Sequence, residues 1–155
     1  MRFTPFRWLA SKIRSKKEAA VPQQPAEAPL YFSTDDRASF WSSAKKGESS
    51  GTQVAGHWHV TNVSNRDLVL LKVRLEGYEA THSHVLTKGP EEAGTATYTS
   101  RNPCAARYMS RVMATLWFFP EICTGREPLV ADVIFTDNYG NEHRVPSVRF
   151  KNYME

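Results

Sequence analysis

Residues 56–77 read GHWHVTNVSNRDLVLLKVRLEG, and apolar and polar residues alternate in both halves of this stretch. Alternation with a period of two is typical of a β-strand that buries one face. In the first half we expect Trp58 and Val60 to face the core, and His57 and His59 to face away from it. The turn residues SNRD between the halves indicate that the two strands follow each other directly.

The strand pattern continues to the end of the chain. The second half of the opening stretch places four apolar residues on one face: Val69, Leu71, Val73 and Leu75. Further strands are expected over residues 79–87, 95–99, 111–119, 129–136 and 142–150. Strands that follow one another through turns, without helices between them, indicate a mainly β protein built as an antiparallel β-sandwich.

The last hairpin, ADVIFTDNYGNEHRVPSVRF at residues 131–150, resembles the final hairpin of bacterial immunoglobulin-like domains. Five positions carry the resemblance: Asp137, Gly140, Asn141, Val148 and Phe150. The resemblance implies an immunoglobulin-like β-sandwich, and no particular function, because that fold serves many. The chain departs from antibody-type domains, because no cysteine precedes Trp58 and their inter-sheet disulfide is therefore absent.

The N-terminal segment differs from the rest in charge. Six basic residues precede the first acidic residue, Glu18, which leaves 14 basic and 16 acidic residues for the remainder of the chain. Thr4 and Pro5 are typical of a helix start, so we expect residues 1–17 to form a basic amphipathic helix. Nine residues would make its two faces: apolar Phe6, Trp8, Leu9 and Ile13, and basic Arg7, Lys12, Arg14, Lys16 and Lys17.

The chain then divides into three further segments. Residues 18–29 are rich in proline and predict an extended linker. Residues 30–53 are expected as a helical and loop lead-in, with a second, shorter helix over 31–47 that ends at Gly47. Residues 54–155 are expected to form the β-sandwich domain.

Several uses of the basic helix remain open. It has the composition of a helix that binds an anionic membrane surface, of a peptide that docks in a groove of a partner protein, and of a cleavable mitochondrial targeting segment. A near-neutral body argues against nucleic-acid binding. The sequence therefore favours a non-enzymatic binding or adaptor module in the cytoplasm, peripheral at a membrane, with mitochondria as the alternative. An exposed sheet edge could add an extended peptide.

The two H-x-H motifs suggest a metal site as a competing function. His57 and His59 share one strand face, as do His82 and His84, and four imidazoles would converge if the two strands were neighbours. Polar residues at alternate positions are also what the solvent face of a strand requires, and we favour that interpretation. No sequence motif of a catalytic site or cofactor site is present, so neither an enzyme nor a cofactor is expected.

Cys104 and Cys123 are the two cysteines of the chain. With no secretory signal pattern at the N-terminus, we expect an intracellular location and two free thiols, with a disulfide between them as the alternative. The sequence leaves open the partner, the oligomeric state and the order of the strands.

Overall fold

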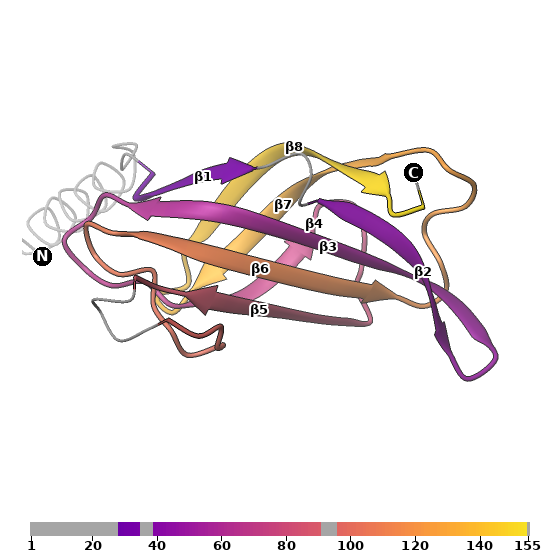
Figure 1. Cartoon of the computed structure of the whole chain (residues 1–155), viewed down its shortest axis with the longest axis horizontal. Helices are drawn as coiled ribbons and strands as arrows, with labels where there is room; N and C mark the ends of the chain where they lie inside the picture. Colours follow the sequence, from indigo (N-terminus) through magenta and orange to yellow (C-terminus); the bar gives the residue numbers. More distant parts are fainter. Residues whose placement is uncertain (1–27, 35–38, 91–95, 155) are drawn as a thin grey trace, which may run out of the picture.

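The fold is mainly β. The computed structural model describes residues 28–34, 39–90 and 96–154, and no helix occurs in this described part. Eight strands make up the body (Figure 1). They are β1 (Leu30–Thr34), β2 (Phe40–Lys46), β3 (Ser49–Asn62), β4 (Leu70–Leu75), β5 (His82–Lys88), β6 (Met109–Phe118), β7 (Leu129–Asp137) and β8 (Glu142–Asn152).

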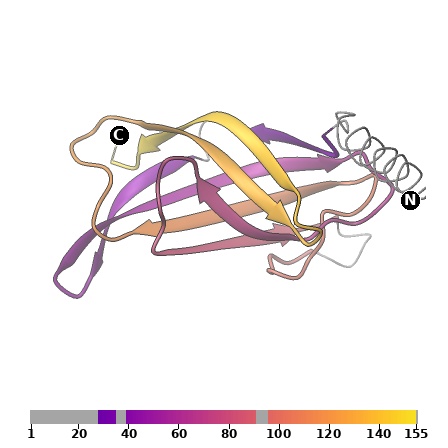
Figure 2. The same ribbon diagram turned by 180° about the vertical axis from the view of Figure 1, so that it is seen from behind.

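The strands form one mixed sheet that is nearly closed into a barrel (Figures 1 and 2). Their order is β4-β7-β8-β2-β3-β6-β5, and β1 pairs with β3. All pairs are antiparallel except β2 and β8, which run parallel through Phe40–Lys151 and Trp41–Asn152. The expectation of an entirely antiparallel arrangement is therefore wrong at this one pair, and the parallel pair joins the two halves of the sheet.

The helix expected over residues 31–47 is wrong wherever this range is described, because β1 and β2 occupy it. Trp41 is 2% exposed and lies opposite Val54 of β3, so strand pairing buries an indole that a short surface helix would leave exposed. Gly47 adopts a φ of 62° in the turn of the β2–β3 hairpin instead of ending a helix. Helix capping signals contribute only about 1 kcal/mol, which is less than burial of a tryptophan side chain.

The sheet therefore begins earlier than expected. Residues 30–53, predicted as a lead-in, belong to β1, β2 and the start of β3 where they are described. The basic amphipathic helix expected over residues 1–17 lies outside the described residues, and so does the linker expected over 18–29 apart from Ala28 and Pro29.

The core is centred on Trp58. Its indole meets the ring of Phe135 edge-on, with 5.3 Å between ring centroids, and Phe135 stacks on Phe32 of β1 at 5.1 Å. The indole lies along its own strand, because a Cβ built on Gly56 would come within 2.3 Å of Trp58 Cη2. The expected faces of β3 are confirmed: Trp58 and Val60 are buried, whereas His59 is exposed and His57 half-buried.

The faces expected for β4 are wrong in its first half. The pairing with β7 shifts register between Leu70 and Lys72, as in a β-bulge. An extra residue on one strand moves the following side chains to the other face. Leu70 is therefore buried and Leu71 is 55% exposed, which reverses the expected alternation, while Val73 and Leu75 are buried as expected.

Candidate functional site

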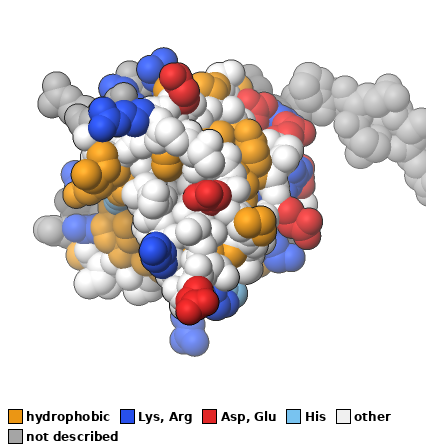
Figure 3. All heavy atoms as spheres, turned by 90° about the vertical axis from the view of Figure 1, so that its right-hand side faces the viewer, with side chains coloured by type: hydrophobic (Ala, Val, Ile, Leu, Met, Phe, Trp, Pro, Cys, Tyr) orange, Lys and Arg blue, Asp and Glu red, His pale blue; other side chains and the backbone are white. Residues whose placement is uncertain are grey.

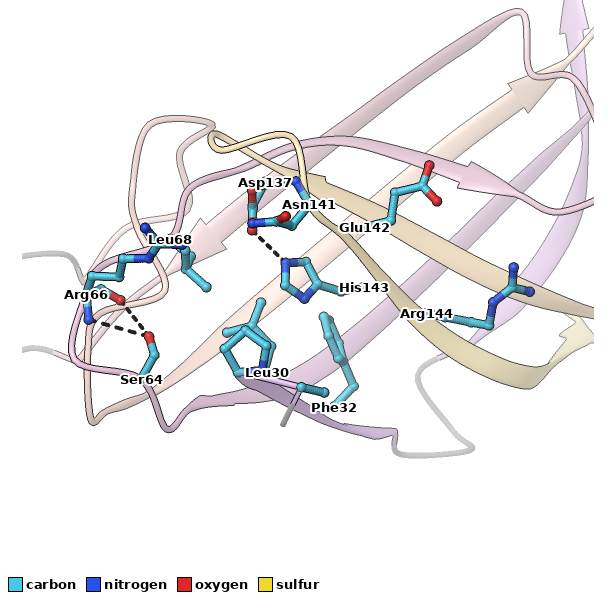
Figure 4. Close-up of a pocket in the computed structure, with 12 residues that line it drawn as sticks. Leu30, Phe32, Ser64, Arg66, Leu68, Asp137, Asn141, Glu142, His143 and Arg144 are labelled. Carbon is cyan, nitrogen blue, oxygen red and sulfur yellow. Dashed lines mark hydrogen bonds and ion pairs between the residues drawn. The ribbon is translucent and has the colours of Figure 1, made fainter. Parts of the chain in front are cut away.

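A cavity of about 600 Å³ lies between β1 and the beginning of β8 (Figure 4). β8 pairs with β2 only at its C-terminal end, and β1 pairs only with β3, so among the described residues no strand joins β1 to the first part of β8. Leu30 and Phe32 of β1 form one wall, and His143 of β8 lies opposite them. The cavity therefore marks the place where the barrel is open.

A buried pair, Asp137 and His143, forms the polar part of this cavity. His143 Nε2 donates to Asp137 Oδ2 at 2.8 Å, and the two side chains are 4% and 1% exposed. The backbone N–H groups of Tyr139 and Asn141 also donate to Asp137 Oδ1, at 2.8 and 3.1 Å. Burial raises the pKa of Asp137, but these hydrogen bonds outweigh it and hold the pKa below its ordinary value.

These contacts give Asp137 a structural role in the β7–β8 hairpin. A carboxylate that accepts backbone N–H groups two and four residues later organises the turn by itself. The hydroxyl that lines the same cavity, Ser64 Oγ, donates to Asn62 Oδ1 at 2.7 Å, so it is not directed at the imidazole of His143. The pair is therefore arranged to hold a hairpin rather than to activate a nucleophile.

The cavity opens at one end of the body, which we call the loop end. The loop end consists of the β3–β4 segment (residues 63–69), the described part of the β5–β6 segment (89–90 and 96–108) and the β7–β8 turn (138–141). Asn62 connects two of these segments, because its Nδ2 donates to the carbonyl oxygens of Arg66 at 2.9 Å and Cys104 at 2.7 Å. Two hydrogen bonds of 2.9 Å between Val69 and Asn138 connect the β3–β4 segment to the β7–β8 turn.

The chain also enters the body at the loop end. The N–H of Val63 donates to the carbonyl oxygen of Pro29 at 2.9 Å, immediately before β1. Large exposed side chains gather there as well: Tyr31, Tyr108, Met109 and Tyr139, each more than half exposed. The described part of the chain therefore begins beside the cavity and beside these side chains.

The four histidines of the metal hypothesis do not converge. β3 and β5 both pair with β6 and not with each other, so the neighbour relation that this hypothesis required is absent. His57 lies opposite Met113 and His84 opposite Thr115, and the ring of His84 packs on Trp117 of β6 at 5.1 Å. Within the described residues no group of three or more His, Cys, Asp or Glu side chains could hold a metal ion.

Added metal should therefore leave the stability of the protein unchanged. We expect Zn²⁺ or Cu²⁺ at equimolar concentration to shift the melting temperature no more than Mg²⁺ does, because a ligand stabilises only a native state that binds it. Thermal unfolding with each ion measures this. A rise in Tm with Zn²⁺ that disappears in the His57→Ala/His84→Ala variant would restore the metal hypothesis.

Neither cysteine is placed for catalysis. Both are free, as predicted from the sequence. Cys104 is fully buried, and burial raises the pKa of its thiol to about 12, so the reactive thiolate is not formed near neutral pH. Burial also raises the pKa of the half-buried Cys123. The nine site residues predicted in the N-terminal segment, from Phe6 to Lys17, lie outside the described residues.

Comparison of the chain with protein-family models, with curated proteins and with solved structures gave no match. No helix in the described part of the chain is long and apolar enough to cross a membrane. The sequence analysis did not single out Asn62, Arg66, Arg107 or His143. The available signal was the turn SNRD, which predicted a loop without indicating what the loop holds.

Proposed function

We propose that the protein is a non-enzymatic binding module whose basic N-terminal segment attaches it to an anionic membrane surface and whose loop end faces that surface. One observation carries the proposal: the chain enters the body at the same end as the open cavity and the exposed tyrosines. A segment with six basic residues and no acidic residue supplies the attraction, since each Lys or Arg near an anionic leaflet contributes about 1 kcal/mol.

The immunoglobulin-like sandwich is part of the proposal. In that fold one sheet has the order A-B-E-D and the other C-F-G. The order β2-β3-β6-β5 and the order β4-β7-β8 correspond to these two sheets, with β2 and β8 as the strands that connect them. In this correspondence the loop end holds the B–C, D–E and F–G loops. Loops at one end of such a sandwich are common binding sites.

The gap between β1 and β8 supports binding of an extended partner. Strand edges without a neighbour can pair with an added strand through their main-chain groups. A cavity of about 600 Å³ with Leu30 and Phe32 on one wall offers an apolar place for side chains of such a strand. A partner protein groove for the basic segment, and its removal as a mitochondrial targeting segment, are the competing proposals for residues 1–17.

Removing the apolar face of the basic segment tests the attachment. We expect Phe6→Ala/Trp8→Ala/Leu9→Ala/Ile13→Ala in the full chain to abolish co-sedimentation with vesicles of phosphatidylcholine and phosphatidylglycerol. The reason is that interfacial binding depends on buried apolar area as well as on charge. Wild type should sediment with these vesicles, release in high salt, and stay in solution with phosphatidylcholine alone.

A matched control separates attachment from folding. The four substitutions lie outside the described body, so the thermal unfolding curve of the variant should coincide with that of wild type. Unchanged sedimentation of the variant would exclude an amphipathic attachment. A wild-type chain that stays in solution with every vesicle would remove the membrane from the proposal and leave the protein groove or the targeting segment.

A further inference from the structure

We propose that Arg66 and Arg107 form a site for anionic lipid head groups at the loop end, so that the body itself, and not only the basic segment, contacts the membrane. The inference rests on the proposed membrane attachment for its ligand. It rests on different residues, which the structure describes, and can therefore fail separately.

Arg107 is held in place by an amide instead of a carboxylate. Its Nε and Nη2 both donate to Asn65 Oδ1, at 3.0 and 2.6 Å. This geometry uses one side of the guanidinium and leaves its other N–H groups available to an anion, and the residue is exposed. A planar guanidinium suits phosphate oxygens because it can donate two parallel hydrogen bonds.

The backbone at Arg107 adds an independent argument. Its φ of 67° lies in the left-handed region, where glycine is favoured and a side chain costs about 1 kcal/mol. Its N–H donates to the carbonyl oxygen of Asn62 at 2.9 Å, which holds this conformation. A strained arginine on an exposed loop indicates that the side chain itself has a use, because glycine would form the same turn with less strain.

Arg66 lies on the neighbouring segment, one residue after Asn65. Its guanidinium carbon is 3.9 Å from the centroid of the Tyr139 ring, a cation–π contact that orients the group without neutralising it. Its carbonyl oxygen accepts from Asn62 Nδ2, the buried amide that also holds Cys104. Both arginines are therefore positioned by loops that Asn62 joins, Arg107 through Asn65 and Arg66 through Tyr139.

Nearby carboxylates are engaged elsewhere. Asp67 accepts from the N–H of Ala106 at 2.8 Å, Asp137 is buried with His143, and Glu142 pairs with Arg74. Within the described residues neither Arg66 nor Arg107 forms a salt bridge. The loop end therefore presents two guanidinium groups whose charge is not compensated by a contacting acid, which favours an anionic ligand.

Exposed apolar side chains beside these cations favour a lipid surface as the source of the anion. Thr61 of β3 pairs with Tyr31 of β1 on one side and with Met109 of β6 on the other. Tyr31 and Met109 therefore lie in one row across the three strands. They are 57% and 56% exposed, and Tyr108 beside them is 51% exposed. Aromatic and apolar side chains next to basic groups are characteristic of surfaces that rest at the membrane interface.

The opposite end of the body also carries exposed apolar side chains, Tyr153 and Met154. Figure 3 shows that end with basic and acidic side chains interspersed over its surface. Two exposed cations there, Lys45 and Arg126, provide a control in which the same net charge is removed away from the loop end.

The test compares three variants of the full chain by co-sedimentation with vesicles of phosphatidylcholine and phosphatidylglycerol. We expect Arg66→Gln/Arg107→Gln to weaken partitioning about 10- to 30-fold, which is the effect of two charges near an anionic surface. Lys45→Gln/Arg126→Gln should stay within about twofold of wild type, because salt screens charges that lie far from the surface. Arg66→Lys/Arg107→Lys should recover only part of the binding, because lysine keeps the charge but not the planar guanidinium that donates two parallel hydrogen bonds.

The results distinguish failure of the inference from failure of the proposed function. If the loop-end and control variants weaken binding equally, the inference is wrong. If only the apolar substitutions in the basic segment abolish binding, the attachment stands and the loop-end site falls. If binding survives those substitutions but is lost in Arg66→Gln/Arg107→Gln, the loop-end site stands and the segment is not the anchor.

Discussion

Replacing Trp58 with alanine is expected to lower the free energy of unfolding by about 3–5 kcal/mol, the usual cost of removing a large buried aromatic side chain. Trp58 is 2% exposed and meets Phe135 edge-on at 5.3 Å. Gly56, over which the indole lies, has no side chain with which to fill the space. A cavity would therefore remain.

Urea unfolding monitored by circular dichroism measures this loss as a lower midpoint with an unchanged m-value. Trp58→Phe is the matched control, because it keeps an aromatic ring in the core. It also removes the indole N–H, which is buried without a hydrogen-bond partner among the described residues. We expect the phenylalanine variant to lose much less stability than the alanine variant. Equal losses would mean that Trp58 does not pack as described.

Replacing Asp137 is expected to have the second large effect. Asp137→Ala removes the acceptor of three hydrogen bonds in the β7–β8 hairpin and leaves His143 buried beside an empty position. A buried donor left without its partner costs about 1–3 kcal/mol, and hydrogen bonds to a charged group contribute about 1.5–3 kcal/mol each. The alanine variant should therefore unfold at much lower urea concentration than wild type, and its hairpin amides should exchange faster with deuterium.

The dependence of folding stability on pH distinguishes the contribution of the Asp137 charge from that of its side-chain shape. The hydrogen bonds hold its folded-state pKa below the ordinary value of 3.8, so the carboxylate adds stability above that pH. This contribution disappears as the pH falls below 3.8 towards the lower folded-state pKa. Asp137→Asn keeps the shape but lacks this ionisation, so stability should fall less steeply for the variant than for wild type below pH 4 or so. Parallel curves for the two proteins would contradict the assignment.

Much of the sheet could be predicted from the sequence, because period-two alternation reports directly which residues a strand buries. The alternation around Trp58 placed β3 correctly at its centre, and β6, β7 and β8 fall close to the ranges 111–119, 129–136 and 142–150. The prediction failed where burial came from a distant strand. Trp41 is buried by pairing with β3 and the parallel contact with β8, and neither partner is visible in the residues around Trp41.

The candidate site could not be predicted from sequence patterns for the same reason. Arg66 and Arg107 lie 41 positions apart, and their loops are joined by hydrogen bonds of Asn62 and by the contact of Arg107 with Asn65. The sequence marked the first loop as a turn and predicted a single helical turn from Asn102 to Met109 in the second, but it did not indicate that the two loops are neighbours. The metal hypothesis depended on strand order in the same way. Spacing places the two histidines of each H-x-H motif on one face of their strand, but only the strand order reveals that β6 lies between the two strands.

By itself, the sequence determined the mainly β class, the solvent-facing position of the histidines of β3, and the separation of a basic segment from a near-neutral body. These follow from residue type and from spacings within one strand, so no distant contact is needed to infer them. The tertiary structure alone decided the strand order, the bulge that exposes Leu71, the opening between β1 and β8, and the contact of Arg107 with Asn65 at the loop end. Each of these depends on hydrogen bonds between residues far apart in the chain, and local alternation carries no record of which distant strand becomes a neighbour.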